Sequence, residues 1–226
     1  FYTMNRLQFP GVNPAYCLMD VNTMQVRELP YFDGDIGAGV TTDASYGGGR
    51  SMKEVCGDMY MVHTVRDDSH LCCHKKDGTV TTVVGDAGAF MAFDMACGKI
   101  LYVGMRDGLL GELYLRDLES GSEKQVSSFN KEYDETHAIV KTERFTFTNK
   151  DGWELDGFVL KPVGYESGKK YPGILQIHGG PKAVYSNIFH HEMQMMASRG
   201  YFVFFTNPRG GDGRGDAFAD ITGQLG

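Results

Sequence analysis

The sequence predicts a protein of mixed β and α/β class, with an all-β region over residues 1–140 and an α/β region over residues 141–226. Three observations lead to this fold class. The first region contains an internal repeat of short strands and turns. The second region begins with two alternating runs around Asp151-Gly152, which predict a β-hairpin. Two apolar runs that enclose a helix-like segment then follow, and this order is typical of parallel strands.

The repeat predicts the architecture of the first region. Residues 57–84 and 98–126 each consist of a glycine, an apolar strand, a polar turn, a second strand, a glycine turn and a third run. They begin 41 residues apart, which is within the length of a β-propeller blade. Because Ala15–Glu28 looks like the outer strands of a preceding blade, we expect a partial propeller of about two and a half blades, too few to close a ring. A small β-sandwich is the alternative.

The two regions are joined by a segment of different composition. Residues 129–142 are polar and charged, and we expect a linker there. Residues 144–148 and 153–160 then alternate between apolar and polar side chains on either side of Asp151-Gly152, which predicts an antiparallel hairpin.

A strand–loop–helix–strand unit follows the hairpin. Residues 173–177 form an apolar run bounded by Pro172 and two glycines, and they predict a buried strand. A helix is predicted over 188–199, with Gly200 at its C′ position. Residues 201–206 predict a second strand, parallel to the first and reached by a right-handed crossover. Because both strands are apolar on both faces, we expect both faces of the sheet to be covered.

The loop after the first of these strands carries the chemistry. It reads His178-Gly179-Gly180-Pro181, and a strand that ends in this way matches the oxyanion loop of α/β-hydrolases. Such a loop needs a backbone N–H directed at a point where negative charge develops. Glycine suits this role because it reaches positive φ at little cost and has no side chain to block a substrate. A tight strand-to-helix turn without a catalytic role is the alternative.

Composition excludes several classes of partner. The net charge of −7 argues against nucleic acid and anionic membranes, because both are polyanions. No apolar run approaches the roughly 18 residues of a membrane helix, and the amino end has no signal-peptide pattern. The five scattered cysteines fit reduced thiols. We expect a cytoplasmic protein without metal or cofactor. The absence of an initiator methionine suggests a piece of a longer protein.

Two further patterns are weak. His190 and His191 precede Glu192, but position 195 is a methionine, so no HExxH zinc pair exists, and the histidines are interpreted as polar-face or capping residues. The glycine-rich segment 207–216 fits neither a Walker loop nor a GxGxxG fingerprint. We expect it to be a mobile loop at the carboxyl end of a strand.

The order of the segments is informative as a whole. The propeller-like repeats are followed by RFTFTNKDGWELDGFVLKP, then YPGILQIHGGP, then a helix, and then YFVFFTNPRGGDGRG. This order resembles the prolyl oligopeptidase family of serine peptidases, and most of all its acylaminoacyl-peptidase branch. The resemblance implies a β-propeller that caps an α/β-hydrolase domain and restricts access to oligopeptides. It places the carboxyl-terminal blades of the propeller at 1–140 and the amino-terminal half of the hydrolase domain at 141–226.

The resemblance also implies roles for particular residues. Gly180 would supply a backbone N–H to the oxyanion hole, and its neighbours in the loop would shape it: His178, Gly179 and Pro181. A second group would line and brace the active-site region, because it matches the Asn-x-Arg-Gly segment of the family: Asn207, Pro208, Arg209 and Gly210. The family usually has an aromatic residue at position 208 and serine or threonine at position 211, where this chain has Pro208 and Gly211.

One element of the family pattern is missing. No serine among the 226 residues has glycine both two positions before and two positions after it, so the GxSxG elbow is absent and no catalytic serine, aspartate or histidine is assigned. We therefore expect the chain to be inactive by itself and its parent to hydrolyse short peptides. The alternatives are a non-catalytic propeller-based binding module and an esterase. We also expect association of chains through an exposed sheet edge.

Overall fold

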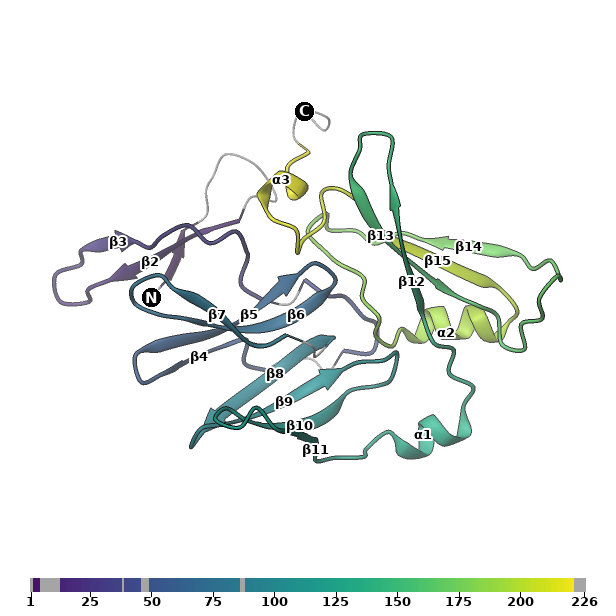
Figure 1. Ribbon diagram of the computed structural model, residues 1–226, viewed down its shortest axis with the longest axis horizontal. Helices are drawn as coiled ribbons and strands as arrows, with labels where there is room; N and C mark the ends of the chain where they lie inside the picture. Colours follow the sequence, from purple (N-terminus) through teal and green to yellow (C-terminus); the bar gives the residue numbers. More distant parts are fainter. Residues whose placement is uncertain (1, 5–12, 38, 46–48, 86–87, 222–226) are drawn as a thin grey trace.

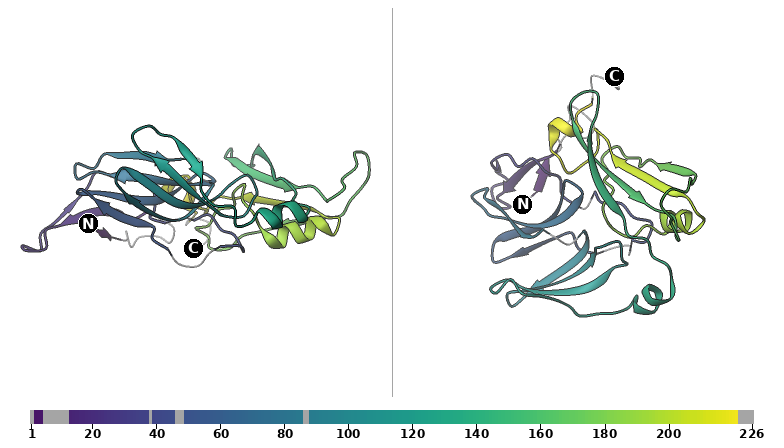
Figure 2. Two further views of the ribbon diagram at one scale, coloured as in Figure 1. Left: turned by 90° about the horizontal axis from the view of Figure 1, so that it is seen from below. Right: turned by 45° about the vertical axis from the view of Figure 1, so that its right-hand side comes forward.

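A computed structural model describes residues 2–4, 13–37, 39–45, 49–85 and 88–221. Within these residues the strands form four sheets (Figure 1). Three are small antiparallel sheets that follow one another along the chain, and they fan out beside one another in Figure 2. The fourth is a mixed sheet at the other end of the molecule, with one helix against it.

The antiparallel sheets are formed by consecutive strands. The first contains β1 (Tyr2–Met4), β2 (Ala15–Met19) and β3 (Val26–Glu28). The second contains β4 (Met52–Val55), β5 (Asp58–Val65), β6 (Asp68–His74) and β7 (Val80–Val84). The third contains β8 (Ala89–Ala96), β9 (Lys99–Met105), β10 (Glu112–Asp117) and β11 (Glu123–Gln125).

The repeat seen in the sequence is confirmed. Residues 57–84 become β5–β6–β7 and residues 98–126 become β9–β10–β11, each as an up-and-down meander completed by one earlier strand. Apolar side chains from both sheets pack together between them: Val62, Leu71, Val84, Phe90, Phe93, Met95, Ile100 and Tyr102. Such stacking buries one face of each sheet against its neighbour, as in a propeller-like array.

The mixed sheet contains the predicted hairpin and the predicted parallel strands. Its strand order is β12 (Glu143–Thr148), β13 (Glu154–Leu160), β15 (Phe202–Asn207) and β14 (Gly173–Gln176). The hairpin pairs antiparallel, whereas β14 and β15 are parallel, with Ile174 opposite Val203. Strand β14 therefore lies at one edge of the sheet.

Within the described part of the chain, only one face of the mixed sheet is covered, whereas the sequence predicted two covered faces. Helix α2 (His191–Ser198) packs on the side of Phe158, Val203 and Phe205, all of which are fully buried. The alternate side chains face the other way and stay accessible: Phe145, Phe147, Leu175 and Phe204 are 38–61% exposed. The sequence pattern records that these positions are apolar, but it does not show which element covers them.

The helices differ from prediction in two respects. The expected linker contains a short helix, α1 (Lys131–Thr136), and α2 begins three residues later than expected. The backbone N–H groups of His191 and Glu192 donate to the two carboxylate oxygens of Asp43, each at 2.7 Å. Since the first N–H groups of a helix have no partner within it, a carboxylate 148 residues earlier in the chain satisfies them.

An ionic network joins the second antiparallel sheet to the mixed sheet. Arg66, in the turn between β5 and β6, donates from Nη2 at 2.8 Å and from Nε at 3.0 Å to Asp156 of β13. Arg144 donates to the same carboxylate at 2.9 Å. Asp156 is 1% exposed, and although burial opposes ionisation, the hydrogen bonds from Arg66 and Arg144 hold its pKa below the usual value. This arrangement fixes the position of one sheet relative to the other.

Candidate functional site

The loop of interest leaves the carboxyl end of β14. Its residues Gly179, Gly180 and Pro181 are exposed, and His178 is partly buried. Gly180 has φ +138°, where a side chain would bring Cβ within 2.8 Å of the Lys182 amide nitrogen, so this position requires glycine. A Cβ at Gly179 would meet no other atom within 4 Å. The peptide bond between Gly180 and Pro181 is cis.

The hydrogen bonding of the Gly180 amide distinguishes this loop from a closed turn. Within the described residues its N–H donates to no backbone or side-chain acceptor. The carbonyl of the preceding residue, Gly179, accepts from His178 Nδ1 at 3.1 Å, which assigns the ring proton to Nδ1. The His178 ring lies edge-on against Tyr185, with 5.1 Å between ring centroids. The loop is therefore not a closed turn that uses its own N–H groups.

The segment after β15 lies directly against this loop. A Cβ built on Gly210 would lie 3.7 Å from the Pro181 Cβ, and one on Gly211 would lie 3.1 Å from the Ala183 carbonyl oxygen. Gly210, Gly211 and Asp212 are buried. The predicted mobile loop is thus packed into the molecule, because the two glycines permit this close approach.

Two side chains of this segment brace it. The carbonyl oxygen Oδ1 of Asn207 accepts the Tyr185 N–H at 2.8 Å, and its Nδ2 donates to the Tyr185 carbonyl at 2.8 Å. Arg209 donates to the carbonyl of Asp220 at 2.8 Å and stacks over Trp153, with 4.8 Å from Cζ to the ring centroid. Arg209 therefore orders the segment around α3 (Asp216–Ala219).

Residues of the amino-terminal β region also hold the loop, and sequence reasoning missed them. The Val184 N–H donates to the Gly39 carbonyl at 2.8 Å, and the Thr41 N–H donates to the Val184 carbonyl at 2.9 Å. Lys182 Nζ donates to Asn13 Oδ1 at 2.6 Å and to Asp35 Oδ2 at 2.8 Å. No sequence pattern links Lys182 to partners 147 and 169 residues away.

Asp212 adds a buried acidic group beside this loop. Its side chain is 10% exposed and lies 4.0 Å from Lys182 Nζ. Burial raises the pKa of the Asp212 carboxyl above its ordinary value, and the nearby Lys182 ammonium opposes that shift. The region beside Gly180 therefore combines a free N–H with a lysine between two carboxylates.

A cavity of about 270 Å³ lies next to the loop on the α2 side of the sheet, lined by Thr41, Thr42, Asp43, Gln176, Tyr185, His190, Glu192 and Met193. His190 is 6% exposed, so the interpretation of this residue as a polar-face histidine is wrong, and its side chain makes no capping hydrogen bond. Burial lowers the pKa of His190 to about 4. His191 is exposed, as expected.

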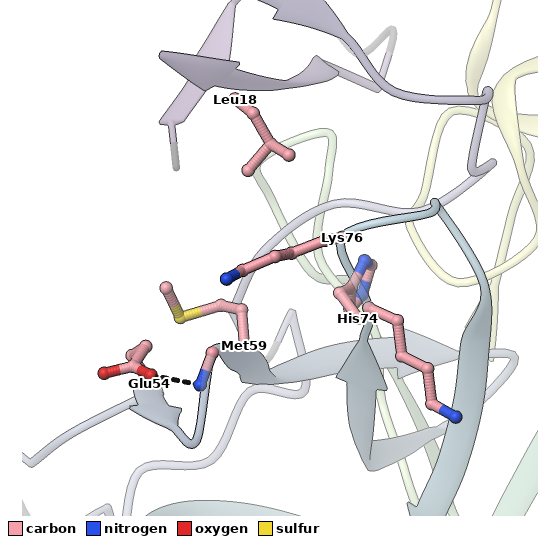
Figure 3. A pocket seen from close by; sticks show the side chains of 7 residues that line it. Leu18, Glu54, Met59, His74 and Lys76 are labelled. Carbon is pink, nitrogen blue, oxygen red and sulfur yellow. Dashed lines mark hydrogen bonds between the residues drawn. The ribbon is translucent and has the colours of Figure 1, made fainter. Parts of the chain in front are cut away.

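A second cavity, of about 250 Å³, lies between the first and second antiparallel sheets, remote from residues 178–181 (Figure 3). Leu18 and Met59 line it from the two sides, with the Lys76 side chain between them. The described residues contain no group of three or more potential ligands that could hold a metal ion. In the same part of the chain, no helix is both long and apolar enough to cross a membrane.

Comparison with known proteins identifies relatives of the chain. The sequence model of the prolyl oligopeptidase family matches residues 187–226. An uncharacterized peptidase of Bacillus subtilis, YuxL, is 36% identical over 105 residues, which are 46% of this chain and 16% of that protein. Dipeptidyl-peptidase 5 of Porphyromonas endodontalis is 27% identical over 174 residues, 74% of this chain and 25% of that protein. The chain thus spans a quarter or less of the length of these relatives.

Solved structures extend the likeness to nearly the whole chain. An acylaminoacyl peptidase in complex with a Z-Gly-Gly-Phe chloromethyl ketone matches 96% of this chain with a TM-score of 0.77 and 26% identity, and the match covers 32% of that structure. Acylaminoacyl peptidase of Pyrococcus horikoshii without ligand gives a TM-score of 0.76 with the same identity and coverage. These neighbours and the peptidase relatives agree with the order of segments in the sequence, and the chain is similar over residues 187–226 to the prolyl oligopeptidase family and over nearly its whole length to solved acylaminoacyl peptidases.

Proposed function

We propose that this chain is part of a serine peptidase that hydrolyses short peptides, of the oligopeptidase or acylaminoacyl-peptidase type. Residues 1–140 form the carboxyl-terminal blades of its propeller, about two and a half in number. Residues 141–226 form the amino-terminal half of its α/β-hydrolase domain. The catalytic serine, aspartate and histidine lie outside these 226 residues, so the chain by itself does not turn over substrate.

The free N–H of Gly180 is the observation that carries this proposal. It stands at the carboxyl end of a parallel strand, where α/β sheets bind their ligands. In acyl transfer the substrate carbonyl oxygen becomes negatively charged, and a fixed N–H directed at that oxygen stabilises the transition state. One such donor contributes roughly 10²–10³ in kcat. The nucleophile and the second donor, the N–H that follows it, are still required for reaction.

The surrounding residues support the donor in different ways. His178, Gly179 and Pro181 shape the loop, while Asn207, Arg209 and Gly210 brace the segment packed beneath it. No metal or cofactor is needed for this chemistry. The substrate class follows from the family and from relatives that are named as peptidases. We place the protein in the cytoplasm because the sequence has the composition of a soluble protein with reduced thiols.

The test uses the longer protein that the gene encodes. We expect a GxSxG elbow downstream of residue 226, labelling of its serine by a fluorophosphonate, and hydrolysis of a chromogenic acylaminoacyl anilide. Gly180→Ala should lower kcat by roughly 10²-fold, because φ +138° and the close Lys182 amide both oppose a side chain. Gly152→Ala is the matched control, since this glycine of the turn between β12 and β13 also has a positive φ, +84°, but open space around it, and it should retain most activity. Equal loss in both variants would contradict the role of Gly180.

The same assays of the longer protein distinguish the peptidase from two other functions. A non-catalytic binding module would bind peptide without fluorophosphonate labelling, and the longer protein would lack the elbow. An esterase would hydrolyse a p-nitrophenyl ester but not the anilide. The isolated 226 residues should give neither reaction, and serine-dependent turnover by them would refute the assignment of the triad to other parts of the protein.

A further inference from the structure

Lys182 connects the loop that carries Gly180 to the amino-terminal β region. Its ammonium group is held by Asn13 and Asp35 at 2.6 and 2.8 Å, and its side chain is only 18% exposed. Water screens an ion pair of this kind less than it screens a pair on the open surface. The contact therefore constrains the lysine more firmly than most surface salt bridges do.

The backbone between Lys182 and Gly180 transmits this constraint. The Lys182 amide nitrogen lies close beneath Gly180, as the 2.8 Å approach of a Cβ built there shows. The Ala183 N–H donates back to the Pro181 carbonyl at 2.8 Å. On the far side of Lys182, Val184 pairs with the backbone of residues 39–41. The ring of Pro181, which stands between the two residues, fixes one backbone torsion between Lys182 and the peptide plane that carries the Gly180 N–H.

The other end of the tether is itself fixed. The backbone carbonyl of Asp35 accepts from Nδ1 of the buried His63 at 2.5 Å. The Asp35 carboxylate oxygen that does not bind Lys182 accepts the Ile36 N–H at 2.8 Å. Asp35 thus presents one oxygen to Lys182 from a position set by the second antiparallel sheet.

We propose that Lys182 is a positioning residue, whose contact with Asp35 and Asn13 sets the direction of the Gly180 N–H. The proposal rests on the proposed function, in which that N–H meets the substrate oxygen. It assigns to the propeller side of the molecule a part in the geometry of the active site, in addition to any restriction of access. A lysine that only joined the two regions would affect stability and leave the Gly180 amide unchanged.

The direct readout is the Gly180 amide in the 226-residue chain. Labelling with ¹³C′-glycine and ¹⁵N-glycine selects the glycine amides that follow another glycine. In this sequence they are the amides of Gly48, Gly49, Gly180 and Gly211. The variant Gly179→Ala removes the Gly180 signal from this set and so assigns it. The test variants are Lys182→Met, which removes the ammonium, and Asp35→Asn, which keeps an acceptor and provides a milder change if the first does not fold.

The control is Lys53→Met. Lys53 also pairs with an aspartate, Asp94, its side chain is 22% exposed, and it joins two sheets away from the loop. We expect the Gly180 signal to move in Lys182→Met and in Asp35→Asn, and to stay in Lys53→Met. The double variant should move it no further than Lys182→Met does, because both changes break the same contact. An unmoved Gly180 signal in the folded variants would overturn the proposal.

Activity of the longer protein gives the second readout. Lys182→Met should lower kcat by roughly ten- to hundredfold, as misplacement of a catalytic group does, with KM within about twofold. Lys182→Arg keeps the charge and should retain most of kcat. A fall in unfolding midpoint with unchanged kcat would overturn the proposal. If the longer protein has no peptidase activity, the proposed function fails, and the Gly180 signal alone decides the role of Lys182.

Discussion

The side chain of Asn207 forms two hydrogen bonds with the backbone of Tyr185, one in each direction and both at 2.8 Å. Asn207 ends β15, and Tyr185 follows the loop that contains Gly180. Both residues are buried, so no solvent replaces these bonds when they are lost. One amide side chain therefore fixes the distance between the end of a central strand and the return of the candidate oxyanion loop.

The first prediction concerns the donor side of this pair. Asn207→Asp should destabilise the chain by about 3 kcal/mol at pH 7, because a carboxylate would face the Tyr185 carbonyl with no proton to donate. The deficit should shrink at low pH, where the protonated acid regains a donor. Asn149→Asp is the control, since Asn149 Oδ1 only accepts, from Asp151 and Trp153 N–H, and it should change stability by less than about 0.5 kcal/mol. Urea unfolding measures both, and equal effects would contradict the donor role.

The second prediction concerns the buried carboxylate of the ionic network. Asp156→Asn should lower the free energy of unfolding by about 3 kcal/mol, because it removes the buried carboxylate that Arg66 and Arg144 share, although each arginine keeps a second acidic partner. Glu143→Gln breaks the Lys161–Glu143 pair, whose side chains are 38% and 56% exposed, and should cost less than about 1 kcal/mol. Since the folded pKa of Asp156 is lowered, its contribution is present above the unfolded pKa of about 3.8 and is lost as pH falls below it. Comparable losses in both variants would contradict the network.

The third prediction is a pH dependence. His190 has a pKa of about 4 in the folded chain, lowered by burial from 6.5. Between these values the unfolded state binds more protons, so the free energy of unfolding falls as pH falls from 6.5 to 4, by up to about 3 kcal/mol from this residue. His190→Gln should flatten the profile relative to the parent chain, and His191→Gln, at the exposed neighbour, should not. Denaturation midpoints across this range measure the slope; identical profiles for the parent and His190→Gln would count against it.

The fourth prediction concerns the open face and edge of the mixed sheet. Leu175 lies on the edge strand β14 and is 61% exposed, next to Phe204 on β15. We expect the 226-residue chain to associate through this surface, and Leu175→Lys should shift it toward the monomer in sedimentation velocity. Leu109→Lys, at a leucine 40% exposed in the loop between β9 and β10, should leave association unchanged. A parent chain that is monomeric at all concentrations would end this expectation.

Much of the fold could be predicted from local patterns. The strand-and-turn repeat, the hairpin around Asp151-Gly152 and the parallel pair around α2 each depend on side chains that are close in sequence. The loop 178–181 was recognised as a candidate for the same reason, because it contains its own glycines, whereas the role expected for the segment after β15 came from the resemblance to a family. Gly180 has the positive φ that a glycine at this position suggests.

The missed features are contacts between distant residues. Lys182 reaches Asn13 and Asp35, and Arg66 reaches Asp156, and none of these pairs leaves a periodic signal in a single sequence. The polar composition around α1 concealed a helix of six residues, too short for an apolar stripe. His190 was misread because a histidine beside another polar residue gives no sign of burial among aromatic rings.

The carboxylate of Asp43 at the start of α2 has a consequence for protein engineering. A chimaera that exchanges the carboxyl-terminal part between relatives at residue 140 would separate α2 from the group that completes its first turn. Such a loss costs about 1 kcal/mol per cap and would add to the loss of the contacts made by residues 35–41. Recombination that respects this architecture must transfer residues 35–43 together with the hydrolase half, although they are distant in the gene.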